Sequence, residues 1–210
     1  MISTADGLER LRAGNRRFVA GTSSSDKALS SARRAELVES QNPFAVILAC
    51  SDSRVPVELI FDQGLGDLFV IRVAGNIVAP SQIGSVEFAA AQLGTRLVVV
   101  LGHSNCGAVA ATLKELAQDQ QQRSPNLRSI VDRIRPAVES LMSDDVSLSA
   151  AVAANVRQSV RQLKRGSQIL EQLNETGELA IIGAEYSIES GEVTYLDAQD
   201  DLPAHRKSIT

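Results

Sequence analysis

The chain has 210 residues, and its 44% hydrophobic and 22% charged residues are typical of one globular domain rather than of a disordered protein. A net charge of −4 gives no attraction to nucleic acid or anionic lipid, and 3% aromatic residues without tryptophan argue against base-stacking surfaces. Since no apolar run approaches the roughly 18 residues of a membrane span and early charges leave no room for a signal peptide, we expect a cytoplasmic protein.

The first forty residues are predicted to form a helical arm. Residues 3–20 place Leu8 and Leu11 on one face of a helix, with Thr4 as its candidate N-cap. A run of glycine, threonine and serines follows, and residues 30–40 predict a second short helix. Because these segments are mostly polar, we expect the arm to bury little by itself and to pack on another body, such as a second subunit.

From residue 43 onward, continuous apolar runs predict strands that are buried on both faces. These strands are expected at 44–50, 68–73, 97–103 and 179–187, with a small antiparallel edge strand at 192–196. Helices are expected between them, at 56–61, 81–93, 106–118, 127–141 and 148–176, the last broken near residues 166 and 167. Strands that alternate with helices predict an α/β fold, with a central, mostly parallel sheet flanked by helices. We expect a single domain over 1–210, with the arm at 1–40, the core at 41–196 and a charged tail at 197–210.

Side chains that bind metals follow two of the predicted strands. Cys50 ends the first predicted strand and Asp52 follows it, and His103 ends the third, with Cys106 three residues later. Open α/β sheets bind ligands at the carboxyl ends of their strands, so these residues can converge. Two cysteines are too few for a disulfide framework at this size, whereas Cys, His and Cys form a ligand set for zinc. Three protein ligands leave a fourth position open, as in catalytic zinc sites.

Asp52 and Arg54 acquire a role beside such a metal. A carboxylate two residues from a guanidinium can form a bidentate pair, which keeps the aspartate ionised and fixes its orientation. Asp52 can then accept a hydrogen bond from the nucleophile at the metal, or it can occupy the fourth position itself.

Other interpretations explain less of the pattern. Either cysteine can be a small buried core residue, and His103 alone can be structural. A phosphatase loop needs five residues between its cysteine and arginine, but only three separate Cys50 from Arg54. No Cys-x-x-Cys, GxGxxG or Walker pattern is present. A zinc-bearing structural subunit has no use for a charged pair beside an open position, so catalytic zinc is favoured.

The two clusters read Ala49-Cys50-Ser51-Asp52-Ser53-Arg54-Val55 and Gly102-His103-Ser104-Asn105-Cys106-Gly107, and further motifs lie at 11–18, 69–76 and 84–89. In these motifs the chain resembles a β-class carbonic anhydrase, from about residue 8 to residue 196. The resemblance implies reversible hydration of CO2 to bicarbonate and a proton. It also implies one Zn2+ per chain on Cys50, His103 and Cys106, with Asp52 and Arg54 as the catalytic dyad.

The resemblance extends to the type of site and to the assembly. Members with an inhibitory bicarbonate site carry a Trp three residues before the first cysteine ligand and a Gly just before it, where this chain has Ile47 and Ala49. Gln41, nine residues before that cysteine, is typical of the plant-like group with an open site, in which the dyad aspartate stays off the metal. The family forms homodimers, or tetramers built from dimers, with the active site at the subunit interface.

The implied substrate pocket contains Gln41, Phe69, Phe88 and the backbone amide of Gly107, with Phe88 standing where plant enzymes usually have a tyrosine. Hydrolases of carbon disulfide or carbonyl sulfide share the fold and the ligands, and they remain an alternative. The one spare histidine, His205, falls in the predicted tail, so no proton shuttle is assigned.

Overall fold

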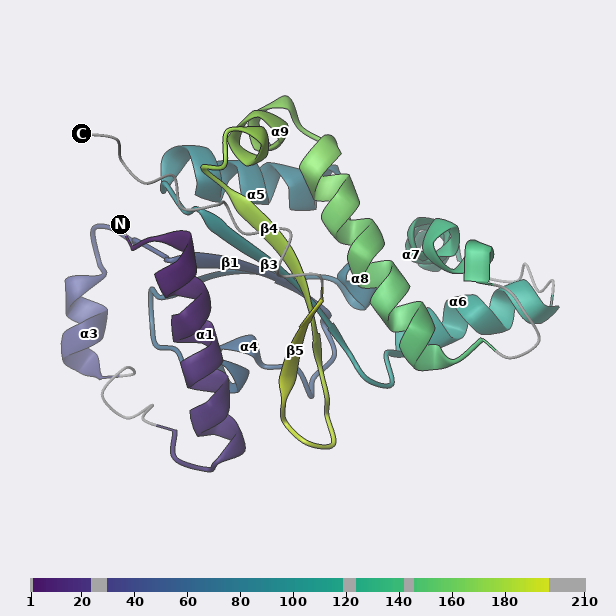
Figure 1. Ribbon diagram of the computed structural model, residues 1–210, viewed down its shortest axis with the longest axis horizontal. Helices are drawn as coiled ribbons and strands as arrows, with labels where there is room; N and C mark the ends of the chain where they lie inside the picture. Colours follow the sequence, from purple (N-terminus) through teal and green to yellow (C-terminus); the bar gives the residue numbers. More distant parts are fainter. Residues whose placement is uncertain (1, 24–29, 119–123, 142–145, 197–210) are drawn as a thin grey trace.

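The computed structural model describes residues 2–23, 30–118, 124–141 and 146–196, and the expected tail with His205 lies outside these ranges. The described strands form one sheet in the order β2-β1-β3-β4-β5 (Figure 1). The four parallel strands are β1 (Ala45–Ala49), β2 (Leu68–Arg72), β3 (Leu97–His103) and β4 (Ala180–Tyr186); β5 (Val193–Leu196) is antiparallel to β4. The predicted fold class is confirmed.

Helices cover both faces of this sheet (Figure 1). One face carries α1 (Thr4–Val19) and α4 (Val57–Ile60), with α3 (Ser31–Glu36) beside α1; the other carries α5 (Pro80–Gln92), α8 (Leu148–Arg165) and α9 (Gln168–Glu175). Two helices, α6 (Gly107–Gln118) and α7 (Pro125–Val138), pack with α8 beyond the carboxyl ends of the strands, and short 3₁₀ turns lie at η1 (Ala74–Asn76) and η2 (Glu139–Leu141). Among the described helices, none combines the length and the apolar character needed to cross a membrane.

The central strands are apolar at successive positions because both of their faces are covered. Ile47 and Val99 pack in the cluster that contains α1 and α4, whereas Val46 and Val98 pack with α5, α8 and α9. Every residue of β1 and β3 is buried. This two-sided burial is what a continuous apolar run predicts for a parallel sheet.

Strand β2 differs from that prediction. It was expected to be buried on both faces, but it is the outermost strand of the sheet, and Leu68, Phe69 and Val70 are only partly buried. The last residue of β2, Arg72, is exposed. An edge strand of one chain keeps open surface that a central strand does not have, although the two read alike in sequence.

The expectation that the N-terminal arm buries little by itself is wrong for α1. Its N-cap is Ser3 rather than Thr4, since the Ser3 hydroxyl accepts the Asp6 N–H at 3.1 Å. Leu8 and Leu11 are almost fully buried in the core of their own chain. By contrast, no residue of α3 is buried, so the expectation holds there.

Candidate metal centre

The two predicted clusters meet at the carboxyl end of the sheet, between β1 and β3. Ala49, the last residue of β1, pairs with Leu101 of β3. Cys50 follows directly, and β3 continues for two more residues to His103. The chain leaves β1 for β2 on one side and returns to β3 on the other, so this is the topological switch point at which α/β sheets bind ligands.

Three buried side chains converge at this point. Cys50, His103 and Cys106 are 5%, 0% and 1% exposed, and one ligand atom from each lies within 4.8 Å of the others. Nδ1 of His103 is 2.9 Å from the Ser104 carbonyl oxygen, which can only accept, so Nδ1 carries the hydrogen. Nε2 then presents a lone pair, and it is a buried atom without a hydrogen-bond partner in the described part of the chain. Two sulfurs and one free imidazole nitrogen suit zinc.

The two thiols compete for one proton. A hydrogen bond from Cys106 lowers the pKa of Cys50 to about 4, helped by the backbone N–H groups of Gly75, at 3.3 Å, and Asp52. The same hydrogen bond, together with burial, raises the pKa of Cys106. Burial lowers the pKa of His103, but the Cys50 sulfur, the Ser104 carbonyl and Asp52 together raise it above its usual value. A divalent cation that replaces the shared proton would relieve this competition.

Asp52 and Arg54 form the bidentate pair expected from their spacing. Arg54 Nε donates to Asp52 Oδ1 at 2.9 Å, and Nη2 donates to Oδ2 at 2.8 Å. These bonds hold the pKa of Asp52 well below its usual range. Asp52 Oδ2 lies 3.9 Å from His103 Nε2, and Arg54 Nη2 is 3.5 Å from the Asn105 carbonyl oxygen. The charged pair therefore lies beside the three ligand atoms.

Of the four predicted substrate residues, one chain brings only Gly107 to this centre, because it follows Cys106 as the first residue of α6. Gln41 is exposed and precedes β1 at the opposite end of the sheet. Phe69 pairs with Val46, four residues before Cys50, or about 13 Å along the strand. Phe88 on α5 is 49% exposed, and its ring centroid is 6.2 Å from that of Phe69.

One contact of the centre had no role in the sequence prediction. Arg72, at the end of β2, donates from Nε to the Cys50 carbonyl oxygen at 3.1 Å and from Nη2 to the Asp52 carbonyl oxygen at 2.6 Å. The sequence feature that could have indicated this role is an arginine at the end of an otherwise apolar strand, β2, which pairs with β1.

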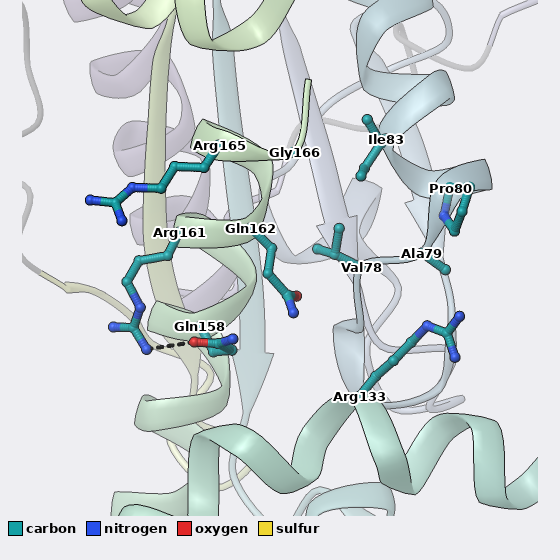
Figure 2. Close-up of a pocket in the computed structure, with 10 residues that line it drawn as sticks. All are labelled: Val78, Ala79, Pro80, Ile83, Arg133, Gln158, Arg161, Gln162, Arg165 and Gly166. Atoms are coloured by element: carbon teal, nitrogen blue, oxygen red, sulfur yellow. Dashed lines mark hydrogen bonds between the residues drawn. The ribbon is translucent and has the colours of Figure 1, made fainter. Parts of the chain in front are cut away.

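A separate cleft of about 500 Å³ lies between α5, α7 and α8 and includes none of the residues above (Figure 2). In Figure 2, Arg133 extends toward Ala79 and Pro80, whereas Arg161 turns away and its Nη2 donates to Gln158 Oε1 at 2.7 Å. The cleft is therefore not part of the metal centre.

Comparisons with known proteins agree on one family. A family model described as carbonic anhydrase matches residues 45–193. A carbonic anhydrase of Mycolicibacterium smegmatis is 41% identical over 186 residues, which are 87% of this chain and 88% of the relative. Carbonic anhydrase 2 of Mycobacterium tuberculosis is 39% identical over 188 residues, 89% of this chain and 90% of the relative. The solved β-carbonic anhydrase CcaA has a TM-score of 0.72 at 30% identity, covering 96% of this chain and 94% of CcaA.

Proposed function

The chain belongs to the β-class carbonic anhydrase family, and from this premise we propose how its own residues carry out the reaction. The protein is a zinc-dependent lyase that interconverts CO2 and bicarbonate. The observation that supports the site assignment is the convergence of Cys50, His103 and Cys106 beside the Asp52–Arg54 pair.

Cys50, His103 and Cys106 would hold one Zn2+ per chain. When bound, zinc lowers the pKa of a water molecule so that it can attack CO2 near neutral pH. The Ser104 carbonyl keeps Nε2 of His103 free for coordination, and the Gly75 N–H moderates the charge on the Cys50 sulfur. The protein therefore supplies both the ligands and the groups that orient them.

Asp52 would orient the nucleophile by accepting its hydrogen bond. Because Arg54 keeps the carboxylate ionised, Asp52 can only accept and cannot donate. We propose an open site at rest, with Asp52 paired to Arg54 and the fourth metal position free for the reaction. Ile47 and Ala49, which are both fully buried, support the plant-like type because they provide neither an indole donor nor space for an inhibitory ion.

The substrate pocket is proposed to form between two copies of the chain. The Gly107 N–H, in the first turn of α6, would stabilise negative charge that develops on a CO2 oxygen. Gln41, Phe69 and Phe88 would complete the pocket of a second subunit, since their own metal centre lies at the far end of the strands. The partly exposed β2 and the half-exposed Phe88 ring support an interface there. We propose a homodimer, or a tetramer built from such dimers.

Two further features belong to this proposal. The two free cysteines, as metal ligands, suit a reducing compartment, which supports a cytoplasmic location. A single sheet carries the core over residues 41–196, which supports one domain over the chain.

Metal analysis combined with a stopped-flow assay of CO2 hydration tests the proposed site. The wild type should hold one zinc per chain, and Cys106→Ser should lose zinc and activity by at least about 100-fold, since the variant lacks a thiolate ligand. Ala110→Ser, which adds a hydroxyl within α6, should match the wild type. A metal-free wild type, or a Cys106→Ser variant with full zinc and turnover, would contradict the assignment.

A further inference from the structure

Arg72 makes two hydrogen bonds to the segment that carries both a metal ligand and the dyad aspartate. Its Nε and Nη2, on one edge of the guanidinium, reach the carbonyl oxygens of Cys50 and Asp52 at 3.1 and 2.6 Å. Because the guanidinium is planar and rigid, the pair of bonds fixes the two peptide groups relative to each other. The arginine itself is anchored by β2, in register with Ala49.

Among the described residues, the Arg72 guanidinium donates to backbone carbonyl groups. Within the described ranges, no carboxylate lies close enough to form an ion pair with it, so its donors serve carbonyl groups alone. Hydrogen bonds from a charged donor are stronger than those between neutral groups. The segment from Cys50 to Asp52 is thereby tied to the edge strand as well as to β1.

This tie matters because Asp52 lies close to the metal ligands. Its Oδ2 is already 3.9 Å from His103 Nε2, and a carboxylate so near a dication is attracted to it. Arg54 opposes that attraction, but it is exposed, and among the described residues its further hydrogen bond is to the Asn105 carbonyl, at 3.5 Å. Such a partner can move together with the carboxylate. A fixed backbone cannot.

We propose that Arg72 is a positioning residue that keeps Asp52 off the metal. It holds the backbone in the orientation from which the Asp52 carboxylate reaches Arg54 but not the fourth coordination position. This inference rests on the proposed zinc site and open resting state. In this proposal the open state depends on the hydrogen bonds from Arg72 of β2 to the segment after β1, as well as on the Asp52–Arg54 pair.

The test uses full-length protein loaded with Co2+ in place of zinc, with azide as a probe of the fourth position. Visible spectra follow azide binding, and stopped-flow assays of the zinc forms follow turnover. Arg72→Ala should keep one metal per chain but bind azide at least about tenfold more weakly, the equivalent of one charged hydrogen bond, because Asp52 now competes. Its kcat should fall by a similar factor. Azide affinity and kcat of Arg72→Lys should lie between those of the wild type and Arg72→Ala, since a single ammonium group cannot reproduce the two parallel hydrogen bonds of the guanidinium.

Two further variants separate this role from general destabilisation. Arg96→Ala removes another arginine-to-carbonyl bond, from Arg96 Nη1 to Ala90 at 2.8 Å, and should behave as the wild type. Adding Asp52→Asn to Arg72→Ala should restore the azide affinity, because an amide is a weaker ligand than a carboxylate. Unchanged azide binding in Arg72→Ala, loss of its metal, or no restoration by Asp52→Asn would overturn the proposal. Failure of the proposed function would instead appear in the wild type, as absent zinc or absent CO2 hydration.

Discussion

Backbone groups orient the three candidate ligand side chains, Cys50, His103 and Cys106. The Gly75 N–H contacts the Cys50 sulfur, the Ser104 carbonyl fixes the tautomer of His103, and the N–H groups that begin α6 favour the Cys106 thiolate. The Ser104 carbonyl and the N–H groups of α6 are backbone groups that other residue types would also supply. Gly75 differs, because its φ is 70° and a Cβ there would lie 2.8 Å from the Ile134 side chain.

Arg54 is expected to act through Asp52, without holding the metal. Arg54→Ala should lower kcat by about 100-fold or more, because the carboxylate loses the two bonds that orient it and can turn to the metal. Zinc should stay at one per chain. Turnover measured beside metal content decides this, with Arg54→Lys retaining part of the rate. Wild-type turnover in Arg54→Ala would refute the role.

The pH dependence of the wild type follows from the lowered pKa of Asp52. A carboxyl whose pKa is depressed by folding stays ionised until the pH is well into the acid range. Titration of Asp52 therefore does not contribute to any loss of rate between pH 8 and 6. We expect a smooth, single-proton decline below neutral pH in stopped-flow assays. A steep decline involving several protons would point to a closing site instead.

Tyr195 allows a second titration test, on β5. Burial raises its pKa above the ordinary value, and its hydroxyl has no hydrogen-bond partner among the residues described. The unfolded chain ionises first as the pH passes about 10, so the stability present below that pH is lost as it rises further. At pH 7 the unfolding free energy of Tyr195→Phe should equal that of the wild type or exceed it by about 1 kcal/mol. The variant should also lose less unfolding free energy than the wild type when the pH rises above about 10. Urea unfolding at pH 7 and about pH 10.5 measures the two free energies. A large loss of stability in Tyr195→Phe at pH 7 would contradict an unpartnered hydroxyl, because it would mean that the hydroxyl makes a stabilising hydrogen bond.

At the scale of elements, α1 is a structural helix of its own chain. The Asn15 amide donates to the carbonyls of Ile60 and Gly191 at 3.2 and 2.9 Å, and its oxygen accepts the Val193 N–H at 2.9 Å. One side chain thus joins α1 to α4 and to the hairpin before β5. Deletion of α1 would therefore remove part of the core of its own chain.

At Gly14, α1 lies very close to the backbone at the end of α4. A Cβ atom at this position would overlap the Phe61 carbonyl oxygen, which is backbone and cannot move cheaply. Gly14→Ala should cost about 1–3 kcal/mol of unfolding free energy. Gly84→Ala is the matched control, since nothing lies within 4 Å of its added methyl, and alanine should stabilise α5 by about 0.5–1 kcal/mol. Chemical denaturation compares the two; a neutral Gly14→Ala would contradict the close contact.

At the scale of the whole molecule, the proposed pocket belongs to two chains. Gln41→Ala removes a hydrogen-bond donor to the substrate, and its turnover should fall by about 100-fold. Cys106→Ser should be inactive for a different reason, because it lacks a metal ligand. Co-expressed, the two variants should regain activity, because one site of each mixed dimer combines intact zinc ligands with an intact Gln41. Roughly a quarter of the sites should then be functional.

The control for this mixing experiment pairs Cys106→Ser with Arg54→Ala. Both changes affect the same chain's metal centre, so a mixed dimer contains no complete site and activity should stay low. Sedimentation velocity on the same samples confirms association. A fully active monomer, or recovery in the control pair, would contradict a shared pocket.

The local part of this protein can be predicted from its residues. Apolar runs and 3.6-residue periodicity identify the central strands and the helices, including the break between α8 and α9 near Gly166. The candidate metal ligands can be predicted because Cys50 directly follows β1 and His103 ends β3, and the carboxyl ends of adjacent parallel strands lie side by side. The Asp52–Arg54 pair follows from a two-residue spacing.

The sequence by itself therefore determined most element types, and it identified the candidate zinc ligands and the Asp52–Arg54 pair from short motifs at the ends of predicted strands. Only the tertiary structure decided that β2 is an edge strand, that α1 lies in the core and that Arg72 reaches the carbonyls of Cys50 and Asp52. The reason is physical: periodicity reports how apolar a segment is, whereas strand order and helix docking depend on pairing between distant segments. For the same reason, the sequence does not predict that Gln41 and Phe88 lie away from the metal centre of their own chain.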